Sequence, residues 1–286
     1  MRVIEIDTAA DYSYVVRRVM SEGHPRTARG KATLDLGLTT VVLREPMNAL
    51  PIGIGRGLNT GIAAYEAASL IAGMTNYPLL LTIAPNFEQF MDPVGHSGSQ
   101  YFHGAYGNRI GTQLNAVVRK LTDDPGSRQA VITLWDPRLD NVRNRSDYPC
   151  TVALAYELEG EYLHATTFMR SNDVWWGFPY DIFQFTQLQI TIANCLKVFP
   201  GTYNHIAQSL HLYEEHNAAA CHFVDTSMPY NHNKDQPHGF GGWGMSVQDA
   251  MRSAWSVLTN SDESRIVAPG EGWYRDRLWK RATRAS

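Results

Sequence analysis

Residues 151–197 of the chain read TVALAYELEGEYLHATTFMRSNDVWWGFPYDIFQFTQLQITIANCLK. Segments 151–157 and 162–169 are rich in β-branched and aromatic residues, and the Glu-Gly step between them is typical of a turn, so we predict two adjacent strands. Segment 182–197 carries apolar residues at helical spacing and predicts a helix. Two paired strands followed by a helix indicate a sheet on which a helix packs.

Further strands and helices are predicted on the N-terminal side of this stretch. They are residues 33–43 and 130–135 as strands, and residues 59–73 and 113–122 as helices, with Gly73 as a C-cap. Strands and helices mixed along one chain predict an α/β (α+β) fold, in which a mixed β-sheet is packed with helices. We expect a single domain over residues 1–286, with a segment from about residue 231 that differs in being rich in Gly, Trp, Arg and Asp.

The composition excludes several classes of protein. A chain of 286 residues with 44% hydrophobic and 19% charged residues can bury a large core. The formal net charge of -3 offers no basic face for a nucleic-acid backbone. No apolar run reaches the roughly 18 residues of a membrane span, and charged residues occupy the N-terminal segment where a signal peptide would be apolar. We therefore expect a cytoplasmic protein, in the host cytoplasm if viral, that binds neither membranes nor nucleic acid directly.

The three cysteines are Cys150, Cys195 and Cys221, with no close C-x-x-C pair, so each is considered as a single thiol. Cys150 follows Pro149, which disfavours a helix before it, and therefore lies at the mouth of a predicted strand, where a side chain can face a cleft. A lone cysteine is more often a small buried hydrophobe than a nucleophile, and we assign Cys195 on the predicted helix to that ordinary role.

A dense polar run, residues 169–181, connects the second predicted strand to the helix. Arg170 offers a rigid fork of donors and Ser171 a hydroxyl, while the following Gly and Pro shape a loop that can approach a ligand closely. This combination suits a phosphate plus a planar base. An exposed loop with a salt bridge is an equally weighted alternative.

The third polar segment is residues 209–216, SLHLYEEH. In an extended segment His211 and Tyr213 point to the same face, so both polar tips can reach one ligand such as a sugar hydroxyl. A metal site of His211, His216 and Glu215 is the alternative, but the H-E-x-x-H pattern of such sites is absent.

Together these three segments resemble the thymidylate synthase family. The Pro-Cys before a strand, the pattern R-S-x-D-V-x-x-G-x-P-[FY]-[ND]-I and the pattern H-x-Y occur in family order. Three earlier matches agree with them: Tyr65-Glu66 with Gly73-Met74-Thr75-Asn76, then Tyr106-Gly107, then Asp124-Pro125-Gly126-Ser127-Arg128. The resemblance covers about residues 26–216.

The resemblance implies a thymidylate synthase-type fold and a one-carbon transfer to C5 of a pyrimidine nucleotide. Cys150 would be the nucleophile that attacks C6, and Glu66 would manage proton transfers through water. The co-substrate would be 5,10-methylenetetrahydrofolate, without a metal. The other implied catalytic residues are Tyr106 and Asp181.

The resemblance also implies how the substrate is held. The implied substrate-binding residues are Arg26, Arg128, Arg170 and Ser171 for the 5'-phosphate, His211 and Tyr213 for the sugar 3'-hydroxyl, and Asp173 and Gly177 in the loop on the base side. In the family the counterpart of Arg128 reaches into the partner's site, so an obligate homodimer is implied, with a sheet face at the interface. Gln129 replaces a second family Arg, and Arg29 is an alternative to Arg26 in the phosphate clamp.

Three departures from the methylating synthases indicate a different reaction. They carry Asn at the position of Asp181, where an amide suits uracil, whereas a carboxyl can accept from the cytosine 4-amino group and share a proton with N3. This departure resembles the deoxycytidylate hydroxymethylase branch. Asp147 replaces their hydrophobic residue three positions before the nucleophile, and their hydrophobic C-terminus is missing, so water could quench the intermediate and give a hydroxymethyl product.

The predicted reaction is dCMP + 5,10-methylenetetrahydrofolate + water to 5-hydroxymethyl-dCMP + tetrahydrofolate. The alternatives within the family are a CMP hydroxymethylase and a C5-methylating synthase on dUMP or dCMP. The alternatives from other classes are a metal-dependent hydrolase and a nucleotide-binding protein without catalysis, such as a translational repressor. An ordinary structural role also exists for Asp181, as the N-cap of the helix that follows it.

Overall fold

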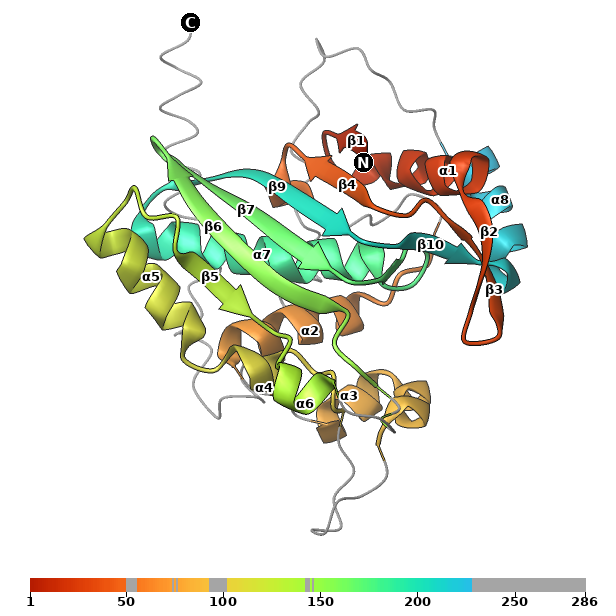
Figure 1. Ribbon diagram of the computed structural model, residues 1–286, viewed down its shortest axis with the longest axis horizontal. Coiled ribbons are helices and arrows are strands. Elements are labelled where there is room, and N and C mark those ends of the chain that lie inside the picture. Colours follow the sequence, from red (N-terminus) through yellow and green to blue (C-terminus); the bar gives the residue numbers. More distant parts are fainter. Residues whose placement is uncertain are drawn as a thin grey trace, which may run out of the picture.

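The computed structural model describes residues 1–49, 56–73, 75, 77–92, 102–141, 145 and 147–227 (Figure 1). A six-stranded mixed sheet forms its centre, in the order β1 (Arg2–Ile6), β4 (Thr39–Leu43), β9 (Phe199–Ala207), β7 (Tyr162–Met169), β6 (Thr151–Glu159) and β5 (Ala130–Thr133). The pairs β1–β4 and β7–β9 are parallel, and the others are antiparallel. This mixed sheet with helices confirms the predicted fold class.

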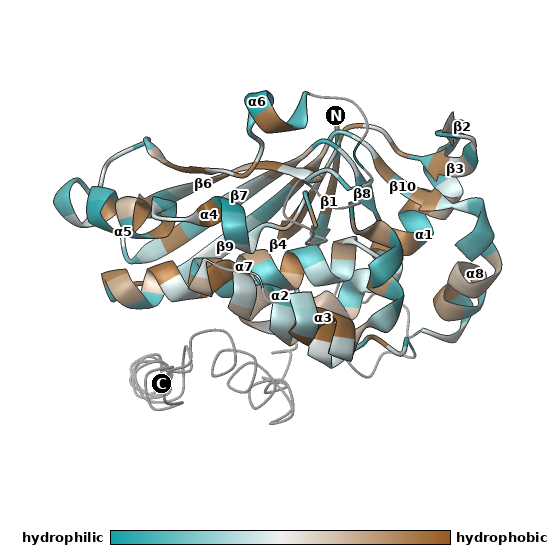
Figure 2. Cartoon of the chain, turned by 90° about the horizontal axis from the view of Figure 1, so that it is seen from below, coloured by the Kyte–Doolittle hydropathy of each residue, from teal (hydrophilic) through white to brown (hydrophobic). Residues whose placement is uncertain are grey.

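Helices cover one side of the central strands. Helix α7 (Phe178–Leu196) packs on β7 and β9, and α2 (Thr60–Ala72) packs on α7 (Figure 2). Nearly every side chain of α7 is buried, because the sheet lies on one side of this helix and α2 on the other. On the opposite face of the sheet Phe168 and Val131 remain 37% and 44% exposed. Large exposed apolar side chains on a sheet face indicate a surface suited to a partner.

Helix α7 begins four residues earlier than the predicted segment 182–197. Gly177 is its N-cap and Pro179 lies at the helix start, where the fixed φ of proline favours a helix. Asp181 therefore lies in the first turn, and the interpretation of Asp181 as the N-cap is wrong. The helix ends at Lys197, which adopts a left-handed conformation with φ +60°.

A smaller four-stranded sheet has the order β2 (His24–Ala28), β3 (Lys31–Asp35), β10 (Leu210–Tyr213) and β8 (Asn172–Asp173). The single strand predicted over residues 33–43 is wrong, since β3 and β4 belong to different sheets. Gly37 separates them with φ +70°, a conformation that glycine adopts without strain, and its N–H donates to Asp35 Oδ1 at 2.7 Å.

The two sheets are joined by a two-stranded ribbon. β4 pairs with β9 in the large sheet, and the same two chain segments continue as β3 paired with β10 in the small sheet. Between the sheets the Leu36 N–H donates to the Leu210 carbonyl at 2.9 Å. The ribbon is therefore hydrogen-bonded through its bend.

The remaining predicted elements are confirmed at β5, β6 and β7, at α2 with Gly73 in the left-handed conformation at its end, and at α5 (Gln113–Asp123). The other helices are α1 (Tyr12–Glu22), α3 (Tyr77–Ile83), α4 (Gly107–Ile110), α6 (Pro137–Asp140) and α8 (Asn217–Thr226), with short 3-10 helices at Ala9–Asp11, Pro46–Asn48, Pro85–Phe90 and Glu214–His216. None of the helices in the described ranges is long and apolar enough to cross a membrane. The predicted C-terminal segment from residue 231 lies outside the described residues.

Candidate active site

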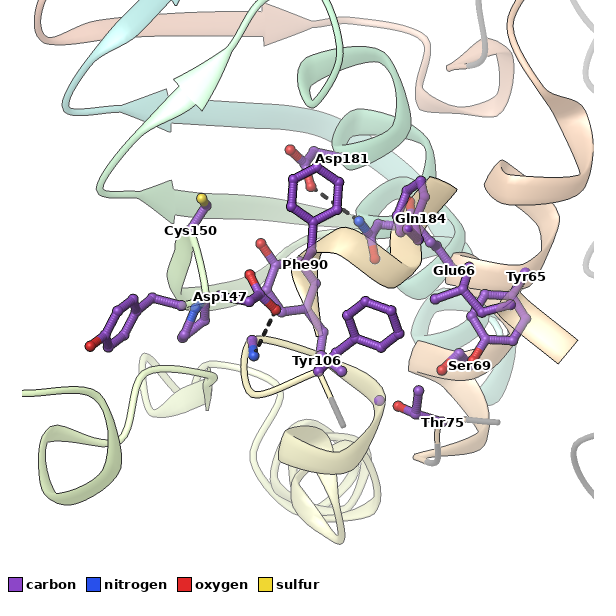
Figure 3. A pocket seen from close by; sticks show the side chains of 18 residues that line it. Tyr65, Glu66, Ser69, Thr75, Phe90, Tyr106, Asp147, Cys150, Asp181 and Gln184 are labelled. Atoms are coloured by element: carbon purple, nitrogen blue, oxygen red, sulfur yellow. Dashed lines mark hydrogen bonds between the residues drawn. The ribbon is translucent and has the colours of Figure 1, made fainter. Parts of the chain in front are cut away.

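A cavity of about 230 Å³ opens between α2, the start of α7 and the segment before β6 (Figure 3). Four of the sequence-predicted residues line it: Glu66 from α2, Tyr106 from the start of α4, Cys150 from the strand mouth, and Asp181 from α7. The fold therefore brings together side chains that are up to 115 positions apart in the sequence (181 minus 66). Asp147 lines the same cavity.

Cys150 stands immediately before β6, as its position after Pro149 predicts. Its side chain is partly buried, and one Arg170 nitrogen lies 3.7 Å from Sγ. The Arg170 guanidinium is fixed by donating to the backbone carbonyl of Pro149 at 2.9 Å. Burial raises the pKa of the Cys150 thiol to about 11, and the charge of Arg170 opposes that rise. The charge of Arg170 thus favours the thiolate form of Cys150.

Tyr106 holds the first residue of β6 in place. Its hydroxyl oxygen accepts from the backbone N–H of Thr151 at 3.2 Å and from the Thr151 hydroxyl at 3.0 Å. Because Thr151 follows Cys150 directly, these bonds also fix the position of Cys150. Its ring packs against Phe185 of α7, with centroids 5.7 Å apart.

Two carboxyl groups share the cavity. Burial raises the pKa of Glu66 to about 8, and the charge of Asp181 adds to this shift. Burial also raises the pKa of Asp181 to about 7, although two hydrogen bonds oppose the rise. At neutral pH Glu66 is therefore mostly protonated and Asp181 is close to half protonated, which suits groups that exchange protons with a ligand.

Two amides hold the Asp181 carboxyl. Asn172 Nδ2 donates to Oδ2 at 2.7 Å, and Gln184 Nε2 donates to Oδ1 at 3.1 Å. Gly177 packs closely behind them: a Cβ at this position would lie 3.0 Å from Asn172 Nδ2 and 3.2 Å from Asp181 Oδ2. The predicted site residue Gly177 thus leaves room for the carboxyl–amide pair.

Asp173, His211 and Tyr213 lie together in the small sheet. Asp173 Oδ1 accepts from the backbone N–H of Trp175 at 2.8 Å and so fixes the loop between β8 and α7. The His211 and Tyr213 rings lie on one face of β10, with centroids 5.1 Å apart, as the alternation predicts. These three residues and Ser171 do not line the described cavity.

The two arginines considered for the phosphate clamp in the β2–β3 hairpin, Arg26 and Arg29, have different surroundings. Arg26 pairs with Asp35 at 2.8 Å and its side chain is 62% exposed. Arg29 lies at the tip of the β2–β3 hairpin; burial raises the pKa values of Cys150 and Tyr213, and the charge of Arg29 is one of the groups that oppose this rise. Arg29 is therefore close enough to act on the nucleophile, whereas Arg26 is held by an ion pair.

Arg128 lies at the far end of β6 from Cys150. It precedes β5, whose first residue Ala130 pairs with Tyr156. Cys150 precedes Thr151 at the other end of β6, so about six residues of strand, or roughly 20 Å, separate the two levels. The geometry does not bring Arg128 to the cavity of its own chain.

The residues weighed for a metal site make other contacts. His216 accepts from the Trp176 indole at 2.8 Å, and Glu215 pairs with Lys31 at 3.0 Å. Within the part of the chain that the structure describes, no group of three or more His, Cys, Asp or Glu side chains could hold a metal ion.

Two contacts of Asp181 were missed by sequence reasoning. Gln184 lies three residues after Asp181 on a helix, so helical spacing alone could have identified it. Asn172 lies in the R-S-x-D pattern at its variable position, where the pattern gives no signal.

The thymidylate synthase family model matches residues 10–230, and the chain belongs to this family. It is 29% identical over 219 residues to a deoxyuridylate hydroxymethyltransferase of Bacillus phage SP01, a match that covers 71% of this chain and 56% of the relative. It is 26% identical over 185 residues to a deoxyuridylate hydroxymethyltransferase of Pseudomonas phage M6, covering 62% and 51%. A thymidylate synthase of Phytoplasma mali is 28% identical over 129 residues, covering 45% and 44%. The chain thus spans about half the length of the curated relatives that it matches.

Proposed function

We propose that the protein is a folate-dependent transferase that adds a one-carbon unit to C5 of a pyrimidine nucleotide. The observation that carries this proposal is the convergence of the Cys150 thiol and the Glu66 and Asp181 carboxyls on one cavity. A nucleophile, a proton-exchanging acid and a base-reading group are the parts that this chemistry requires.

Each residue has a defined step. The Cys150 thiolate adds to C6 of the pyrimidine, and the electron pair of the C5–C6 double bond moves to C5, which becomes a carbon nucleophile. Methylenetetrahydrofolate, when bound, supplies a one-carbon unit at the oxidation level of formaldehyde. Glu66, through water, takes up and returns protons near C5. C5 forms a bond to the one-carbon unit, the C5 proton leaves, and tetrahydrofolate is expelled, which leaves an exocyclic methylene on the ring. Water adds to this methylene, and the electron pair that the addition returns to the ring expels Cys150 as C5–C6 becomes a double bond again.

The cavity lining fits a folate as co-substrate. Phe87 and Phe90 on the 3-10 helix Pro85–Phe90, with Leu80 and Phe102, line the cavity, and Phe90 is 47% exposed. Flat apolar surfaces of this kind suit a planar heteroaromatic ring. These side chains would hold the ring against the nucleotide and exclude bulk water from one side.

We propose a cytosine nucleotide, dCMP or CMP, as the substrate and a hydroxymethyl group as the product. A protonated Asp181 donates to cytosine N3 and accepts from the 4-amino group, and its pKa of about 7 makes that form available. Asp147 places a further polar group on the cavity wall, which favours water as the final reactant. The names of the two phage relatives support hydroxymethylation and favour dUMP as the second candidate substrate.

One experiment tests the proposal. The protein is incubated with dCMP, CMP, dUMP or UMP and methylenetetrahydrofolate, and the nucleotide products are weighed by mass spectrometry. We expect a hydroxymethyl product from a cytosine nucleotide. Product from dUMP alone would replace the proposed substrate with that of the phage relatives, and a methyl product would replace the proposed reaction.

We further propose a homodimer formed through the open face of the six-stranded sheet. Support comes from the exposed apolar side chains on that face and from the distance of Arg128 from its own cavity. The phosphate would then be held by Arg170, Ser171 and Arg29 of one chain and by Arg128 of the partner. His211 and Tyr213 would contact the sugar.

A further inference from the structure

A chain of buried hydrogen bonds continues behind Asp181, away from the cavity. Asn172 donates to Asp181 at 2.7 Å, as described above, and its Oδ1 lies 3.0 Å from His205 Nε2. The other ring nitrogen, His205 Nδ1, lies 3.0 Å from the Tyr203 hydroxyl. Asn172, His205 and Tyr203 are at most 3% exposed, and only Asp181 of the four lines the cavity.

The donors and acceptors in this chain depend on one another. Burial lowers the pKa of His205 to about 3, so the ring is neutral and carries a single N–H. Because Asn172 directs its NH2 group to Asp181, its carbonyl faces His205, and that bond requires the hydrogen on Nε2. Nδ1 is then a bare acceptor and takes the hydrogen of the Tyr203 hydroxyl. Every donor therefore points towards Asp181.

The reversed arrangement would change what Asp181 offers to a ligand. If His205 carried its hydrogen on Nδ1, the Asn172 amide would turn its NH2 group to Nε2 and its carbonyl to Asp181. A protonated Asp181 would then donate its hydrogen to Asn172, and none would remain for the base. The tautomer of a histidine outside the cavity thus decides whether the Asp181 proton is available in the cavity.

Resting on the proposed function, we propose that His205 is a positioning residue for base selection: its Nε2–H fixes the Asn172 amide, which reserves the Asp181 proton for N3 of a cytosine base. The His205 ring is itself held by edge contact with Phe178 of α7, with ring centroids 5.1 Å apart. The Tyr203 hydroxyl donates to Nδ1 of His205 and so keeps the ring hydrogen on Nε2.

Two substitutions and one control test this role by activity. His205→Phe keeps a ring against Phe178 but removes both nitrogens, whereas His205→Gln retains a donor for Asn172. We expect the ratio of kcat/KM for dCMP over dUMP to fall at least tenfold in H205F and to recover substantially in H205Q. His164→Phe removes a histidine on β7 that bonds Thr202 at 2.8 Å, outside this chain, and should leave the ratio unchanged. An unchanged ratio in folded H205F overturns the proposal.

A spectroscopic measurement on the wild-type protein covers the case in which H205F does not fold. The 15N shifts of the His205 ring identify which nitrogen carries hydrogen. Hydrogen on Nε2 supports the proposal, and hydrogen on Nδ1 overturns it. This measurement does not depend on which nucleotide is the substrate, so a failure of the cytosine assignment and a failure of the His205 role are distinguished.

Discussion

The substitution Asp181→Asn tests base recognition most directly. The shape of the side chain is conserved, but one acceptor becomes a fixed NH2 donor. At the Oδ2 position an oxygen still accepts from Asn172, so the new nitrogen takes the Oδ1 position, where Gln184 must turn its amide to accept. The side chain at position 181 then has one acceptor and one donor in a fixed order, and its titratable proton is lost.

The magnitude follows from the two contacts with the base. On the proposed function, the wild-type carboxyl donates to N3 and accepts from the 4-amino group of cytosine, whereas the fixed amide would donate to O4 and accept from N3–H of uracil. A mismatched buried contact costs about 1–3 kcal/mol, so two of them lower the cytosine-over-uracil ratio of kcat/KM by roughly a hundredfold or more.

The assay measures kcat/KM for dCMP and dUMP with methylenetetrahydrofolate in both proteins, with thermal unfolding as the control for folding. Because the N-cap of α7 is Gly177, the substitution removes no helix cap, and any loss of stability should be modest. An unchanged ratio in a folded variant would refute base reading by Asp181 and favour the methylating branch of the family.

Four further predictions follow from the same geometry. Cys150→Ala should lower kcat by several powers of ten with nucleotide binding retained, while Cys195→Ala, at the exposed end of α7, should be nearly neutral; equal losses in steady-state assays would contradict a nucleophilic Cys150. If Arg128 acts in the partner's site, a mixed dimer of one Arg128→Ala chain and one Cys150→Ala chain has one site with both defects and one site with none. Purified heterodimers should then regain up to half the wild-type activity, whereas no recovery would favour a phosphate site within one chain. Asp147→Leu should shift the products from hydroxymethyl-nucleotide towards methyl-nucleotide, with one dihydrofolate formed for each methyl product. An unchanged product ratio by mass spectrometry would show that Asp147 does not favour water as the final reactant. The pKa of Glu66 rises from 4.5 in the unfolded chain to about 8 in the folded protein, so between pH 4.5 and about pH 8 the folded protein binds more protons than the unfolded chain. The free energy of unfolding of the wild-type protein should therefore fall as pH rises through this range. Denaturant titrations at both ends of the range should show a smaller fall for Glu66→Gln.

The sequence was sufficient for elements whose pattern is local. The alternation of residues 162–169 predicted β7, and Gly73 marked the end of α2, because each signal lies within its own element. The division of 33–43 into two strands was missed, since Gly37 is flanked by aliphatic and β-branched residues that continue the strand pattern on both sides. The start of α7 was missed because aromatic side chains before Asp181 show no helical period, although Pro179 marks a helix start.

The site was predictable where a motif carries it. Cys150, Glu66 and Asp181 were identified by family resemblance, and the fold places them around one cavity. The contact between Asn172 and His205 joins residues 33 positions apart, from β8 and from the middle of β9, and no local pattern encodes it. The resemblance left Arg26 and Arg29 as alternatives, because the hairpin turn between them and the ion pair of Arg26 with Asp35 are not encoded in a local pattern.

The bent ribbon between the two sheets has a consequence for selectivity. β9 carries His205 behind the base-reading carboxyl, and β10, which continues the same segment after two residues, carries His211. The Leu36–Leu210 hydrogen bond joins the two segments at the bend, so both histidines lie on the same bent ribbon. On the proposed function, the groups that contact the sugar and the histidine behind the base-reading carboxyl therefore belong to one continuous segment of chain, so a substitution in the bend should affect sugar and base selection together.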